Sequence, residues 1–143
     1  METDKRYQTM ITLWFALLMS VALYFLFSLF VAPGTGHQRS NSPMLILGLT
    51  ALGTLIVVVS FPVKKKLLER SVEKQDVLLV QKALVIACAM CEASALLGLL
   101  EHFTVGNREY YFLFLLAAGG IALHFPKRSQ LEAASYKSRN IVN

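Results

Sequence analysis

The feature that most constrains this chain is the near-absence of charge over its first half. Between Met10 and Pro62, the only residue with a charged side chain is Arg39. The 143-residue chain is 55% apolar and 16% charged, so its charges are concentrated in separate segments. A soluble domain of this size could not cover its surface with uncharged stretches of that length. The sequence therefore predicts a membrane protein with several spans.

The first apolar run, residues 11–32, has 22 residues without a charge. As a helix it is about 33 Å long, which matches the roughly 30 Å hydrocarbon core of a bilayer. A cleaved signal peptide is the alternative, but its apolar core is usually about 7–15 residues long, so we favour an uncleaved span. Three later apolar runs predict three more spans. The predicted fold is an all-α integral membrane four-helix bundle in one domain, residues 1–143, with spans at residues 11–32, 43–63, 77–103 and 109–126.

The distribution of Lys and Arg predicts the orientation of these spans. Of the 14 such residues, twelve lie in the first ten residues, in residues 64–82 or in the tail, residues 127–143. The two on the other side are Arg39 and Arg108. Loops rich in Lys and Arg stay in the cytoplasm. We therefore expect cytoplasmic termini (N-in/C-in), a cytoplasmic loop at residues 64–76 that extends the neighbouring helices, and a cytoplasmic tail that is a short surface helix or disordered.

The third span carries one ionisable residue near its middle, Glu92. A charge at the bilayer centre costs about 2.5–3.5 kcal/mol on insertion scales, so such a residue has to face protein or water. Two interpretations are open. Glu92 is either a structural acid that hydrogen-bonds to another span, or a protonatable group that serves proton or cation movement. The candidate hydroxyl partners within other spans are Ser20, Ser28, Thr50, Thr54 and Ser60.

A ridge of small side chains follows the same predicted helix at helical spacing. It consists of Ala83, Ala87, Cys91, Ala95 and Gly98, with Ser94 as an alternative to Ala95. Small residues allow helices to approach closely in lipid. The small-residue ridge therefore predicts a helix-packing face and, with it, a homo-oligomer or a membrane partner protein.

The segment Cys91 to Leu100, CEASALLGLL, resembles the second helix of the proteolipid c subunit of rotary ATP synthases. Glu92 matches the ion-carrying carboxylate of that family and Gly98 matches its later glycine. The resemblance implies a non-enzymatic, c-subunit-like protein in which Glu92 binds the transported ion. The second span departs from that family, since it has two glycines in place of a GxGxGxG stripe. As a whole, the chain resembles small four-span proteins of the bacterial inner membrane, which predicts that location.

A second function from a different class is a scaffold or accessory protein in which Glu92 is purely structural. In that case the basic segment binds a partner or anionic lipid. The candidate residues are Lys64, Lys65, Lys66 and Arg70, together with the tail. The net charge of +5 does not by itself indicate nucleic acid, because no aromatic and basic pattern or known binding motif accompanies it.

Other candidates have simpler interpretations. Cys88 and Cys91 have CxxC spacing, but an apolar span lacks the positive charge that activates a thiol, so we interpret them as small packing residues. A cation could be held near the ends of the third and fourth spans by Glu101, His102 and Glu109, although polar residues are common at interfaces.

The remaining sequence signals favour interfacial and packing roles over chemistry. His124 is expected at the cytoplasmic interface, Trp14 at a membrane boundary, and the mid-span aromatic residues in lipid or packing contacts. We find no set of nucleophile, base and acid, no phosphate loop and no metal motif. The sequence predicts neither an enzyme nor a cofactor.

Overall fold

The computed structural model describes residues 2–31, 43–105 and 109–135, and its regular structure within these ranges is entirely helical, as predicted. The five helices are α1 (Glu2–Phe30), α2 (Pro43–Lys74), α3 (Val77–Thr104), α4 (Tyr110–Leu123) and α5 (Arg128–Ser135). Three of them, α1, α2 and α3, are long and apolar enough to cross a membrane. These helices support the interpretation as a membrane protein.

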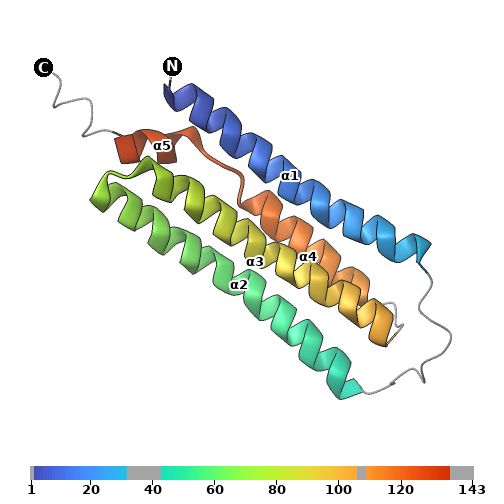
Figure 1. The fold of residues 1–143 in the computed structure, drawn as a ribbon. Helices are drawn as coiled ribbons and strands as arrows, with labels where there is room; N and C mark the ends of the chain where they lie inside the picture. Colours follow the sequence, from blue (N-terminus) through green and yellow to red (C-terminus); the bar gives the residue numbers. More distant parts are fainter. Residues whose placement is uncertain (1, 32–42, 106–108, 136–143) are drawn as a thin grey trace, which may run out of the picture.

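The long helices run side by side, and α3 contacts each of the other four helices. Figure 1 shows α3 and α4 between α1 and α2, with α5 at the end where α1 begins and α2 turns into α3. An ion pair of 2.9 Å between Arg128 and Asp4 joins α5 to the start of α1. Helix α3, which carries Glu92, is therefore the central element of the fold.

The segment expected as a loop at residues 64–76 is mostly helix, because α2 continues to Lys74. The actual turn is two residues, Gln75 and Asp76. Gln75 has a positive φ of 52°, which reverses the chain directly after the helix. The Asp76 carboxylate then accepts a hydrogen bond of 2.9 Å from the amide of Leu78 and caps the start of α3.

The fourth apolar helix is shorter than the predicted span at residues 109–126. It ends at Leu123, where the amide of His124 bonds to the carbonyls of Gly120 and Ile121. Pro126 follows and lacks the N–H that a continuing helix needs. At 14 residues, α4 is about 21 Å long and stops well before the neighbouring α2 and α3.

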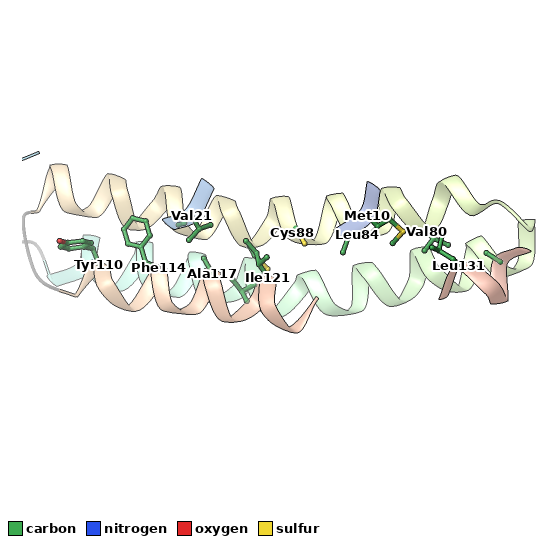
Figure 2. Close-up of a cluster of buried hydrophobic side chains, with 14 residues drawn as sticks. Met10, Val21, Val80, Leu84, Cys88, Tyr110, Phe114, Ala117, Ile121 and Leu131 are labelled. Carbon is green, nitrogen blue, oxygen red and sulfur yellow. The ribbon is translucent and has the colours of Figure 1, made fainter. Parts of the chain in front are cut away.

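Buried apolar side chains form a row along the whole length of the molecule (Figure 2). The row runs from Tyr110 and Phe114 of α4, past Cys88 and Leu84 of α3, to Leu131 of α5. By contrast, the outward faces keep large apolar residues exposed, such as Leu47 at 70% and Leu115 at 73%. Apolar surfaces that remain open on the outside of a chain indicate contact with lipid or with another protein.

Several predicted features lie outside the described residues. They are the end of the first span at Ala32, the loop that follows it, the turn around Gly106 and Asn107, and the part of the tail from residue 136 onward. Within the tail, residues 128–135 form α5, so this part of the tail is a helix.

Candidate functional site

Glu92 lies on the side of α3 that faces α1, where it is partly buried. Its Oε1 atom is 2.7 Å from Oγ of Ser20 and 3.0 Å from the hydroxyl of Tyr24. Ser20 and Tyr24 are four residues apart on α1 and therefore share one face of that helix. Two hydroxyl groups from α1 thus converge on a single carboxyl oxygen near the middle of α3.

The hydroxyl of Ser20 has two possible acceptors. Its Oγ lies 2.7 Å from the backbone carbonyl of Leu17 and also 2.7 Å from Oε1 of Glu92. A serine hydroxyl has one proton to donate and can accept from other donors. It can therefore donate a hydrogen bond to a charged Glu92, or donate to the carbonyl of Leu17 and accept a hydrogen bond from a neutral Glu92. The same heavy-atom positions satisfy both protonation states.

Sequence reasoning included Ser20 among the possible partners but missed Tyr24. The predicted role of Tyr24, a packing or lipid-facing group, followed from its position within an aromatic-rich span. The spacing of four between Ser20 and Tyr24 is the signal that would have paired them. Two other candidate hydroxyls donate to carbonyls of their own helices, Ser28 to Phe25 O and Thr54 to Thr50 O. Ser60 donates to Val57 O and also lies close to His124 and Cys91, away from Glu92.

The small-residue ridge lies on a different side of α3 from Glu92. All five of its members are buried: Ala83, Ala87, Cys91, Ala95 and Gly98. A Cβ added at Gly98 would lie 3.1 Å from Cβ of Leu113 and 3.2 Å from the carbonyl oxygen of Tyr110 on α4. The ridge contacts described here are within one chain, so the ridge positions α4 and α2 against α3.

The two cysteines are free and fully buried, with exposed fractions of 0%. Sγ of Cys91 lies 3.6 Å from Oγ of Ser60, and it also fits against Gly120, where an added Cβ would lie 2.8 Å from that sulfur. This environment agrees with the interpretation of both cysteines as packing residues.

A second polar group lies nearer the α5 end and joins α2 to the end of α4. Nε2 of His124 is 2.8 Å from Oγ of Ser60, and the amine of Lys64 donates to the backbone carbonyl of His124 at 2.9 Å. His124 is 1% exposed and Lys64 is 8% exposed. The expectation of an interfacial histidine was thus incomplete, because His124 is enclosed by protein. Ser60 and Lys64 are four apart, which is the sequence signal for their shared face.

The candidate basic residues separate into two pairs. Lys64 and Lys65 line a pocket of about 530 Å³ between α2, the end of α4 and α5. Lys66 and Arg70 are exposed on α2 and do not line it. The structure therefore distinguishes residues that the sequence grouped together.

At the opposite end, the three residues considered as cation ligands do not assemble into a site. Glu101 is fully buried, and neither of its carboxyl oxygens has a hydrogen-bond partner among the described residues. Nε2 of His102 lies 3.1 Å from the carbonyl oxygen of Val31, whereas Glu109 is exposed. Within the described residues, no group of three His, Cys, Asp or Glu could hold a metal ion.

Comparison of the chain with known protein families, with curated proteins and with solved structures gives no match. The class that the fold supports is a helical membrane protein with three long apolar helices and a shorter fourth. Any more specific function has to be argued from the residues themselves.

Proposed function

We propose that this chain is a non-enzymatic, four-span protein of the bacterial inner membrane in which Glu92 takes up and releases a proton. In this proposal both termini lie in the cytoplasm. The main support is the geometry at Glu92, whose Oε1 meets the hydroxyls of Ser20 and Tyr24 at 2.7 and 3.0 Å. No Lys or Arg side chain is bonded to Glu92 within the described residues.

The chemistry of the proposed step is a simple proton exchange. A hydronium ion transfers its proton to the carboxylate oxygen, which gives the neutral acid and a water molecule, and the reverse step returns the proton to water. A salt bridge would oppose this exchange because it stabilises the charged form alone. Hydroxyl groups are suited to it, since each can donate to the carboxylate or accept from the acid.

The sequence around Glu92 supports the same proposal. CEASALLGLL resembles the carboxylate-bearing helix of c subunits, in which a carboxyl group is followed by small residues. The resemblance also favours a cation as an alternative cargo, and self-association of the chain. The small-residue ridge is buried within the chain, so it cannot form the contact between copies of the chain. The outward apolar faces are exposed and could form that contact.

A hydrophobic carbodiimide tests whether the Glu92 carboxyl is accessible and protonatable. In mild detergent we expect one adduct on Glu92, detected by mass spectrometry, with labelling that decreases as the pH rises because the reagent needs the acid form. The matched control is the fully buried Glu101, so Glu101→Gln should label normally whereas Glu92→Gln should not. Absence of an adduct on Glu92 at every pH would contradict the proposal.

Movement of protons is tested in vesicles that contain the purified protein. Under an imposed membrane potential, the pH of the vesicle lumen should change faster with the wild type than with Glu92→Gln. The sign of the potential sets the direction: a negative lumen draws protons in and becomes acidic. Glutamine can still hydrogen-bond to Ser20 and Tyr24, so this variant is expected to keep the fold. Equal proton flux in folded wild type and Glu92→Gln would show that Glu92 does not carry protons.

The second candidate function is the scaffold or accessory protein, in which Glu92 only attaches α1 to α3. The observation that favours it is that α5 packs against the rest of the molecule at the basic end of the chain, where Arg128 pairs with Asp4 and Leu131 is buried. Binding of a membrane partner or anionic lipid at that end would then be the function. This candidate predicts normal function in Glu92→Gln.

A further inference from the structure

The pocket near α5 combines positive charge with an apolar wall. Its volume is about 530 Å³, within the usual range of about 300–1,000 Å³ for small-molecule sites. Its charged lining residues are Lys64, Lys65 and Lys127, with Glu69. Three amines and one carboxylate leave an excess of positive charge, which favours an anionic ligand.

The most constrained of these amines belongs to Lys64. Lys64 is 8% exposed, and among the described residues its Nζ donates one hydrogen bond, to the carbonyl of His124. An ammonium group has three N–H donors, so a neutral carbonyl satisfies only part of it. No carboxylate within the described residues pairs with Lys64, and the charge of Lys127 repels it. A buried cation without a counter-ion is costly, and an anion in the pocket would remove that cost.

The apolar wall of the pocket indicates that the anion belongs to a lipid. Phe61, Leu123 and Phe125 line the pocket and are 39%, 74% and 44% exposed. Leu123 ends the apolar helix α4, so this wall continues into the outward apolar face of that helix. A free phosphate would leave the wall in contact with water, whereas an acyl chain would cover it.

The fold itself produces the pocket. Because α4 stops at Leu123 while α2 continues to Lys74, the space beside α2 beyond the end of α4 is bordered by the chain that leads into α5. Figure 1 shows this step between the end of α4 and α5. The basic residues therefore gather where the apolar part of the molecule ends, which is the level of lipid headgroups in the proposed orientation.

We infer that this pocket binds an anionic phospholipid of the phosphatidylglycerol class. The phosphodiester lies between Lys64, Lys65 and Lys127, and an acyl chain lies over Phe61 and Leu123. This inference rests on the membrane placement proposed above. It does not depend on proton exchange at Glu92.

The test is retention of defined lipids by the full-length protein in mild detergent, measured by native mass spectrometry. Phosphatidylglycerol should be retained in preference to phosphatidylcholine by about tenfold or more. The double variant Lys65→Gln/Lys127→Gln should bind phosphatidylglycerol about 25-fold more weakly, at about fivefold for each lysine. The matched control Lys66→Gln/Lys74→Gln removes the same two charges outside the pocket. Its affinity for phosphatidylglycerol should fall by less than twofold.

Several results would overturn the inference. Equal losses in the two double variants would show diffuse attraction to the basic surface. Displacement of the lipid by inorganic phosphate at the concentration needed for a short-chain phosphatidylglycerol would show a site for a small anion. Glu92→Gln is expected to retain lipid normally, and the pocket variant to react normally with carbodiimide, so failure of one proposal is distinguishable from failure of the other.

Trp14 provides an internal check that the pocket is intact in these variants. It is the only tryptophan of the chain, its indole N–H donates to Ile121 O at 2.7 Å, and its ring contacts Phe125 with centroids 5.1 Å apart. An unchanged emission spectrum in both double variants is required before their lipid retention is compared. A changed spectrum in Lys65→Gln/Lys127→Gln calls for the single variants, where each is expected to lose about fivefold.

Discussion

At the scale of single residues, adjacent glycines in α4 have opposite environments. A Cβ added at Gly120 would lie 2.8 Å from Sγ of Cys91 and 3.0 Å from Cγ1 of Val57, whereas one added at Gly119 would contact nothing within 4 Å. Gly120→Ala should therefore destabilise the protein by about 1–3 kcal/mol, because α4 must move away from α2 and α3. Unfolding in a denaturing detergent measures this change.

Gly119→Ala is the matched control for that experiment. It adds the same methyl group to the same helix, and it should be neutral or stabilising by about 0.5–1 kcal/mol, because glycine is a poor helix former. Equal destabilisation by the two substitutions would mean that α4 does not pack as described. The sequence shows only a Gly-Gly pair, which does not indicate which glycine faces the protein.

The partners of Glu92 illustrate what residue-level reasoning can and cannot supply. The need for a polar partner follows from the cost of burying an acid in an apolar span, and Ser20 was among the predicted partners. Selection of Ser20 and Tyr24 from all available hydroxyls depends on the rotation and axial position of α1 against α3. No local pattern determines these quantities, because apolar spans tolerate many packing registers.

At the scale of helices, α5 is attached to the rest of the molecule by few side chains. Its buried residues are Leu131 and Ala134, at 1% and 0% exposed. Leu131→Ala should weaken this attachment by about 2 kcal/mol, the lower end for loss of a buried leucine, because a short helix can move to close part of the cavity. We expect faster hydrogen exchange in residues 128–135 and unchanged exchange in α3.

The control for α5 is Ser129→Ala, at an exposed position of the same helix. It should leave hydrogen exchange in residues 128–135 within about twofold of the wild type, because exposed substitutions usually change stability by less than about 0.5 kcal/mol. Similar acceleration in both variants would indicate that Leu131 does not attach α5.

At the scale of the whole molecule, the orientation can be tested by labelling introduced cysteines. Lys74→Cys and Glu109→Cys place exposed thiols at opposite ends of α3. With a membrane-impermeant maleimide, Glu109→Cys should react in intact spheroplasts and Lys74→Cys only after lysis, as the excess of Lys and Arg requires. The wild type is the control, since its two cysteines are buried.

The reverse labelling pattern would place the basic segments outside the cytoplasm. It would also remove the basis for assigning the pocket at α5 to the cytoplasmic leaflet. Reaction of both cysteines in intact spheroplasts would contradict a membrane-crossing α3.

The sequence by itself determined that the chain is helical and apolar, where α3 begins and ends, and that Glu92 needs a polar partner. These properties depend on local composition and on the period of the helix. Only the tertiary structure decided that α1 supplies two hydroxyls to Glu92, that the small-residue ridge packs within the chain, and that Lys64 and His124 meet. The physical reason is that such contacts depend on how the helices rotate and shift against each other. Rotation and shift are set by the close packing of many apolar side chains together, so no single local pattern predicts them.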